Sequence, residues 1–322
     1  MKTQTVAAFD SPFQTRVELI RQTFTSTLHK PIQRVAVVTG LHGDELEGLY
    51  IVHRLLDFLE TLKHQQPGAF LGEIHVYPAA NPQAINHASR LWPGLGTDLN
   101  RVMGETHSDL LPARWARHLV EDLKAQADLV VDLHASNLQL RELPQVRILD
   151  SFASRLLPLA RHTNCDLAWV HPMADLFAAT LGYTLNQAKI PALVIETGIC
   201  QRVTPRFGDQ VFAGLIHLLI RTGALDEGVA LPGPVKTPVE ILPSQVVLAT
   251  AGHSGLFVEE VQLGEFVGAG QTLGRILDPT RGRVLEEVTA PASGLLFTLR
   301  AMPLVHAGAL VARIALEREP PP

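Results

Sequence analysis

The sequence is poor in cysteine, has no excess of basic residues and contains no long apolar run. Cys165 and Cys200 are its only cysteines among 322 residues, which excludes a disulfide framework and a cysteine-rich zinc site. The formal net charge of −5 lacks the basic excess that nucleic-acid binding requires. The longest apolar runs, such as Val211–Ile220, are shorter than the roughly 20 residues that span a bilayer. The N-terminus lacks the apolar stretch of a signal peptide. We therefore expect a cytoplasmic protein without nucleic-acid or membrane partners.

The pattern between Arg34 and Gly198 predicts an α/β fold. Short apolar, β-branched runs alternate there with segments of helical period, as in a parallel or mixed sheet flanked by helices. The predicted strands are Arg34–Thr39, Glu73–Pro78, Asp128–Leu133, Val146–Leu149, Asp166–Val170 and Ala192–Glu196. The predicted helices are Glu45–Leu62, Pro112–Ala127, Phe152–Arg161, Leu176–Lys189 and Gly208–Thr222.

The amino-acid composition of the sequence changes after Gly223. Residues 224–245 are rich in proline and glycine and predict a linker or crossover segment between an α/β domain, 1–223, and a small all-β domain, 246–322. The glycine-punctuated strands of the last segment resemble the barrel-sandwich folds of lipoyl and biotinyl carriers. A carrier needs a modifiable lysine, and none follows Lys236. We expect this domain to cap a site or to mediate subunit contact, so a homo-oligomer is possible.

Metal-ligand residue types follow two of the predicted strands. His42 and Glu45 lie in the segment VAVVTGLHGDELEG, just after a strand, and His134 ends the segment DLVVDLH. Binding sites in open α/β sheets form at the carboxyl ends of strands, so these three side chains can meet at one ion. Two imidazoles and one carboxylate make the ligand set of a catalytic zinc with an open position for water, and the ligand types favour zinc over other metals.

Two further segments place polar groups near those strand ends. The long stretch between Tyr77 and Glu105 has the length and composition of a functional loop. It supplies Asn100 and Arg101, whose amide and guanidinium suit capture of a carboxylate, unless Arg101 only pairs with Asp98 on the surface. Glu196 ends the apolar strand IPALVIETG, where burial would raise its pKa and fit it for proton transfer.

These motifs resemble those of the succinylglutamate desuccinylase/aspartoacylase family, a branch of the zinc carboxypeptidase superfamily. HGDE, NPQA followed by Arg90, DLNR, DLHAS and ALVIETG appear here in the family's order, over roughly Arg34 to Gly198. The resemblance implies a zinc-carboxypeptidase-like mixed sheet flanked by helices, followed by a smaller, barrel-sandwich-like all-β domain. It also implies hydrolysis of N-acyl amino acids or related small carboxylate metabolites.

The resemblance assigns a role to each motif residue. His42, Glu45 and His134 would hold one Zn²⁺ per chain, Arg90 would polarise the scissile carbonyl, and Glu196 would be the general base. Asn100 and Arg101 would hold the substrate carboxylate. The chain departs from the family in one respect, because the C-terminal segment contains no tyrosine to bind substrate. Either Tyr183 replaces it or the role is absent.

Two other functions remain open at this point. A metallocarboxypeptidase acting on peptides would use the same metal site and carboxylate clamp. A zinc-binding recognition protein without catalytic activity would use the pocket only for binding, although retention of Glu196 argues against this alternative. The sequence does not identify the acyl group or the amino acid.

Overall fold

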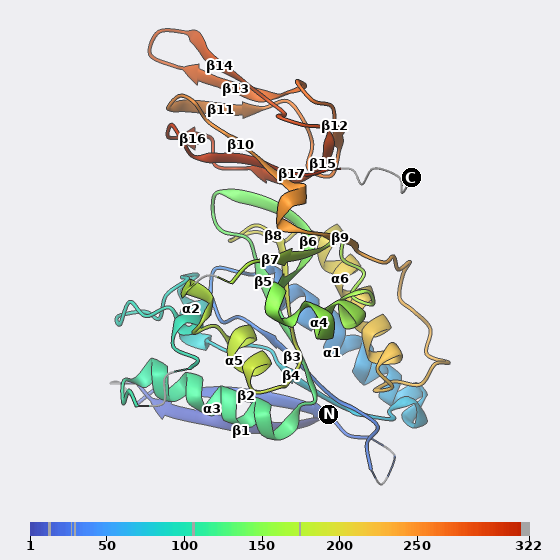
Figure 1. The fold of residues 1–322 in the computed structure, drawn as a ribbon. Helices are drawn as coiled ribbons and strands as arrows, with labels where there is room; N and C mark the ends of the chain where they lie inside the picture. Colours follow the sequence, from blue (N-terminus) through green and yellow to red (C-terminus); the bar gives the residue numbers. More distant parts are fainter. Residues whose placement is uncertain (12–13, 27, 29, 105–106, 174, 317–322) are drawn as a thin grey trace.

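The computed structural model describes residues 1–11, 14–26, 28, 30–104, 107–173 and 175–316 (Figure 1). A mixed sheet forms its centre, and the predicted α/β class is confirmed. Strands β4, β3, β5 and β8 lie side by side in parallel, β6 is antiparallel to β8, and β7 is parallel to β6. These central strands are β3 (Arg34–Thr39), β4 (Glu73–Tyr77), β5 (Leu129–Ala135), β6 (Leu140–Leu149), β7 (Leu167–His171) and β8 (Ala192–Gly198).

Helices cover both faces of this sheet. Apolar residues of α1, α4 and α6 share one core cluster with the sheet, and those of α3 and α5 share a second cluster on its other face. Strands buried on both faces read as nearly continuous apolar runs, which explains why the sequence predicted them. The helices are α1 (Glu47–Gln65), α2 (Pro82–Asn86), α3 (Leu111–Gln126), α4 (Ala153–Ala160), α5 (Leu181–Gln187) and α6 (Pro205–Arg221). The 3₁₀ turns are η1 (Pro67–Ala69), η2 (Leu99–Arg101), η3 (Asp150–Phe152), η4 (Asp175–Phe177) and η5 (Pro243–Gln245).

One predicted helix is shorter than expected. The prediction ran from Leu176 to Lys189, but α5 begins only at Leu181. Thr180 precedes it in an extended conformation, and its side-chain oxygen accepts a hydrogen bond from the backbone N–H of Tyr183. A side chain that satisfies a free N–H in this way fixes the start of a helix. Thr180 therefore sets the position of Tyr183 on the first turn.

The N-terminal hairpin was not predicted from the sequence. Strands β1 (Lys2–Asp10) and β2 (Arg16–Phe24) pair with each other in antiparallel fashion, and β2 also pairs with β4. Buried and partly exposed positions alternate along β2, so the strand lacks the continuous apolar run that marked the central strands. This hairpin extends the sheet at the side away from β6.

The C-terminal segment forms two packed sheets, which confirms the predicted smaller all-β region (Figure 1). One sheet is continuous with the central sheet, because β15 pairs with β6 through Thr298 opposite Glu142. It contains β10 (Val246–Thr250), β12 (Phe266–Val267), β15 (Gly294–Arg300) and β17 (Leu310–Leu316). The other sheet contains β11 (Gly255–Glu259), β13 (Thr272–Asp278), β14 (Arg283–Thr289) and β16 (Leu304–Val305).

The segment between these parts is not structureless. Residues 224–245 contain β9 (Val239–Ile241), which pairs in parallel with β7. The division into residues 1–223, 224–245 and 246–322 stays a prediction, since the sheet runs across its second boundary. Among the described residues, no helix combines the length and the apolar character needed to cross a bilayer.

Candidate functional site

The loop after β3 brings His42 and Glu45 together before α1 begins. Gly40 turns the chain with a φ of 74°, a conformation that favours glycine. Gly43 lies so close to α2 that a Cβ atom there would be 1.9 Å from the carbonyl carbon of Ala84. The backbone N–H of Gly43 also donates to the carbonyl of Ser89. The two glycines therefore let this loop pack tightly on α2 and the residues just after it.

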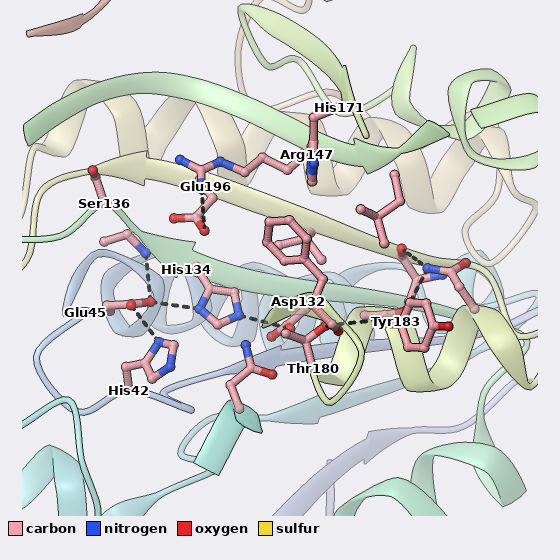
Figure 2. A pocket seen from close by; sticks show the side chains of 18 of the residues that line it. His42, Glu45, Asp132, His134, Ser136, Arg147, His171, Thr180, Tyr183 and Glu196 are labelled. Atoms are coloured by element: carbon pink, nitrogen blue, oxygen red, sulfur yellow. Dashed lines mark hydrogen bonds and ion pairs between the residues drawn. The ribbon is translucent and has the colours of Figure 1, made fainter. Parts of the chain in front are cut away.

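His134 reaches the same point from the carboxyl end of β5, as the sequence predicted it could. Its Nδ1 lies 2.8 Å from Glu45 Oε2, and His42 Nδ1 lies 2.6 Å from Glu45 Oε1 (Figure 2). One ligand atom from each of the three residues falls within 4.8 Å of the others, and all three side chains are buried. Two imidazoles and a carboxylate at this spacing can hold one zinc ion and leave a position for water.

Each imidazole has a second carboxylate behind it. His42 Nε2 lies 3.0 Å from Asp98 Oδ1, and His134 Nε2 lies 3.0 Å from Asp132 Oδ2. Carboxylates on the outer nitrogen of metal-binding histidines fix the tautomer and the ring orientation, and leave Nδ1 as the donor to the metal. This arrangement fits a metal centre and supports the choice of His42 and His134 as ligands.

The sequence reasoning did not assign these roles to Asp132 and Asp98. Asp132 stands two residues before His134 in an otherwise apolar strand, and side chains at that spacing share one face of a sheet. The carboxylate partner of His134 could therefore have been predicted from the sequence. Asp98 lies far from His42 along the chain, and no local pattern connects the two.

The long loop contributes Arg90, Asn100 and Arg101 to the wall of the same pocket. Arg90 donates to Asp98 Oδ2 at 3.0 Å and to Glu45 Oε1 at 3.3 Å, while 39% of its side chain stays exposed. Asn100 accepts the backbone N–H of Leu181 through Oδ1, which leaves its amide N–H groups to donate. Arg101 donates to the backbone carbonyl of Asn100. These three residues therefore present donors at one side of the pocket.

Glu196 lies on β8 directly opposite His134 of β5. Burial raises the pKa of Glu196, although the nearby Arg147 guanidinium acts in the opposite direction. Arg147 Nη1 lies 3.5 Å from Glu196 Oε1, and Arg147 Nη2 donates to Glu142 at 2.6 Å. Arg313 of β17 also donates to Glu142, at 2.7 Å. A chain of alternating charges thus connects the C-terminal strands to Glu196.

The residues around this centre line one cavity of about 530 Å³ (Figure 2). Tyr183 is part of its wall, and its ring packs against Phe152 with 5.9 Å between centroids. Arg147, Arg313 and His171 also line the cavity, and the sequence reasoning gave none of them a role. They come from strands that are distant along the chain, so only the sheet pairing brings them here.

Cys200 lies close to the group of His42, Glu45 and His134 but is not suited to act as a nucleophile. It forms a buried cluster with Asp44 and Glu45. Burial, together with the two carboxylates, raises the pKa of the Cys200 thiol. The thiol therefore stays protonated near neutral pH, whereas the thiolate is the reactive form.

Comparison with known proteins supports the resemblance on which these roles rest. The sequence model of the succinylglutamate desuccinylase/aspartoacylase catalytic domain matches residues 31–220. N-alpha-acetyl-L-2,4-diaminobutyric acid deacetylase from Halomonas elongata is 26% identical over 281 residues, which cover 86% of this chain and 80% of that protein.

Solved structures share the fold over almost the whole chain. A succinylglutamate desuccinylase/aspartoacylase from Rhodobacter sphaeroides superposes with a TM-score of 0.78 at 20% identity, covering 99% of this chain and 96% of that one. The product-bound ectoine utilization protein EutE from Ruegeria pomeroyi superposes with a TM-score of 0.77 at 21% identity, covering 96% and 93%. Because the family model matches more than half of this chain, the chain belongs to the succinylglutamate desuccinylase/aspartoacylase family.

Proposed function

We propose that this protein is a zinc-dependent amidohydrolase that cleaves the amide bond of an N-acyl amino acid or a related small carboxylate metabolite. The observation that carries the proposal is the convergence of His42, Glu45 and His134 in one pocket with Glu196. The deacetylase name of the Halomonas relative supports the same reaction class. A bound Zn²⁺ would lower the pKa of a water molecule and polarise the scissile carbonyl.

The protein's own residues divide the remaining work. Glu196 takes a proton from the attacking water and returns it to the leaving nitrogen, a task for which its partly buried position and raised pKa suit it. The Arg90 guanidinium donates to the carbonyl oxygen, where negative charge develops in the transition state. Asn100 and Arg101 pair with the substrate carboxylate and orient the amide toward Glu196.

The cavity suits either reaction at the scissile amide. A volume of about 530 Å³ accommodates a single acylated amino acid or the terminal residues of a peptide. The carboxypeptidase reaction differs only in the group attached to the scissile carbonyl, which is a peptide chain instead of a small acyl group. A series of peptides of increasing length therefore separates the two reactions.

The test is release of free amine from acetyl-, succinyl- and formyl-amino acids and short peptides by the zinc-loaded protein. Glu196→Gln is expected to lower the rate roughly 10²- to 10⁴-fold, the usual contribution of a general acid–base group, with zinc content unchanged. Glu227→Gln, at an exposed position, serves as the matched control and should behave as wild type. Faster cleavage of peptides than of acyl amino acids would indicate the carboxypeptidase. Full zinc binding without any turnover would indicate a recognition protein.

A further inference from the structure

The cavity extends well beyond the catalytic groups. Besides the polar residues at the metal-ligand group, its wall contains a set of apolar and aromatic side chains from β6, β8, α4, α5 and the turns before them. We call this part the apolar lobe; its residues are Leu149, Phe152, Leu156, Phe177, Tyr183 and Val194.

The strand register places the apolar lobe along the sheet from the catalytic end. Glu196 lies opposite His134, and Val194, two residues earlier on β8, lies opposite Asp132. Arg147 of β6 pairs with Val194, and the two strands are antiparallel. Leu149, two residues after Arg147, therefore lies two residues further from Glu196 than Val194 does. At about 3.3 Å per residue, the lobe begins roughly 7 Å from the level of Glu196 and continues to roughly 13 Å. An acetyl methyl at the scissile carbonyl would not reach it.

Two of the polar side chains that border the lobe, Asn186 and Thr180, already have partners. Asn186 donates to the carbonyls of Gly182 and Ala192, and its oxygen accepts from the N–H of Ala192. Thr180 donates to the carbonyl of Phe177 and caps α5. Burial lowers the pKa of His171, which keeps that imidazole neutral. Apart from the Tyr183 hydroxyl, the lobe therefore offers a ligand apolar contact rather than hydrogen bonds.

The charges around the cavity also disfavour a cationic substituent. The carboxylates among its described lining residues are Glu45, Asp132 and Glu196; Asp132 lies at the level where the lobe begins, with its Oδ2 3.0 Å from His134 Nε2. The strand register places Asp132 on one side of Val194 and the guanidinium of Arg147 on the other. Beyond Val194, none of the described lining residues is a carboxylate, so an ammonium group there would be desolvated without a carboxylate partner, at a considerable cost in free energy.

We infer that the apolar lobe binds an uncharged apolar or aromatic substituent of the substrate, of about the size of a phenyl ring or a short alkyl chain. This inference rests on the proposed function and names its substrate class. The group is either the acyl chain or the amino acid side chain, because both start at the scissile amide. Burying a side chain of this size corresponds to roughly a 10- to 100-fold gain in kcat/KM over a methyl group.

A substrate panel shows whether the acyl chain or the amino acid side chain enters the lobe. The zinc-loaded protein is assayed with N-acetylalanine, N-acetylphenylalanine, N-benzoylalanine and N-acetyl-2,4-diaminobutyrate. We expect at least a tenfold higher kcat/KM for N-acetylphenylalanine or N-benzoylalanine than for N-acetylalanine, and the preferred one identifies which substituent enters the lobe. Equal or faster turnover of N-acetylalanine or of the diaminobutyrate compound would overturn the inference while leaving the amidohydrolase function intact.

Variants link the preference to the lobe. Phe152→Ala removes the ring that packs on Tyr183 and should lower the kcat/KM ratio of the preferred bulky substrate to N-acetylalanine roughly tenfold. Phe58→Ala is a matched control, because Phe58 is another partly exposed phenylalanine, on α1, and packs edge-on against Phe212. It should leave the ratio unchanged, and a similar fall in both variants would count against the lobe.

A binding measurement keeps the inference testable if no compound is hydrolysed. Calorimetric titration of zinc-loaded Glu196→Gln with the same four compounds reports affinity without turnover. Tighter binding of an apolar compound than of N-acetylalanine would support the lobe even if the proposed hydrolysis fails. Equal affinities for all four compounds would overturn the inference.

Discussion

Asp132→Asn tests whether the carboxylate behind His134 supports the metal centre. Asp132 is 1% exposed, and its Oδ2 lies 3.0 Å from His134 Nε2, on the side of the ring away from Glu45. The substitution keeps the size of the side chain but removes its charge, and its amide can present either an oxygen or an N–H group to the imidazole. His134 then loses the partner that fixes its tautomer and its orientation.

The expected loss of zinc affinity follows from this geometry. Carboxylates in this position typically contribute 10- to 100-fold to metal affinity, which corresponds to about 1.4 to 2.8 kcal/mol. We expect a value near the upper end, because Asp132 is almost fully buried and water cannot replace the lost contact. Asp98→Asn should show the smaller effect on affinity, since 16% of the Asp98 side chain is exposed and water can reach it. That variant should also weaken catalysis by releasing Arg90.

The assay is competition for zinc between the protein and a chromophoric chelator, followed by activity at saturating zinc. Asp128→Asn provides the control, because Asp128 lies just before the same strand and pairs with Arg34 at the surface. Its zinc affinity should equal that of wild type. If Asp132→Asn binds zinc as tightly as Asp128→Asn does, then the carboxylate has no role in the metal centre and the assignment of His134 loses its main support.

Three further predictions concern stability and the connection to the C-terminal strands. Burial, aided by nearby Arg21, lowers the pKa of His75 to about 4 from 6.5. The unfolded chain therefore binds more protons between these values, and the free energy of unfolding should fall by about 2 kcal/mol from pH 7 to pH 4.5; urea titrations should show a shallower pH dependence for His75→Gln. Gly43→Ala should cost roughly 1 to 3 kcal/mol by thermal denaturation, because its Cβ would overlap the Ala84 backbone, and an unchanged Tm would contradict the close packing. Arg313→Met removes a hydrogen-bond donor from buried Glu142 and should lower the free energy of unfolding by roughly 2 to 4 kcal/mol, a loss that the 21% exposure of Arg313 moderates. Adding Glu142→Gln should restore part of this loss. If the effects of the two substitutions simply add, the charges of Arg313 and Glu142 are not coupled.

The amino-acid sequence determined the central sheet and the order of its motifs. Strand β3 spans the predicted residues Arg34–Thr39, because five consecutive buried positions read as an apolar run. His42, Glu45 and His134 were predictable as a group, since each follows a strand whose carboxyl end lies at the same edge of the sheet. Their spacing along the chain mattered less than their common position after apolar strands.

The tertiary structure alone decided what surrounds that group. Asp98 reaches His42 across 56 residues of sequence, and Arg313 reaches Glu142 across 171. No periodicity or motif encodes such contacts, because they depend on how separate strands pair and on which side chains then face one cavity. The pairing of β15 with β6 carries β17 and Arg313 to the pocket, whereas the change in composition after Gly223 had indicated only a separate domain. Local hydrophobic patterns thus specified where the central strands lie, although β6 begins at Leu140 and not at the predicted Val146, and the long-range register of the sheet specified the chemistry between them.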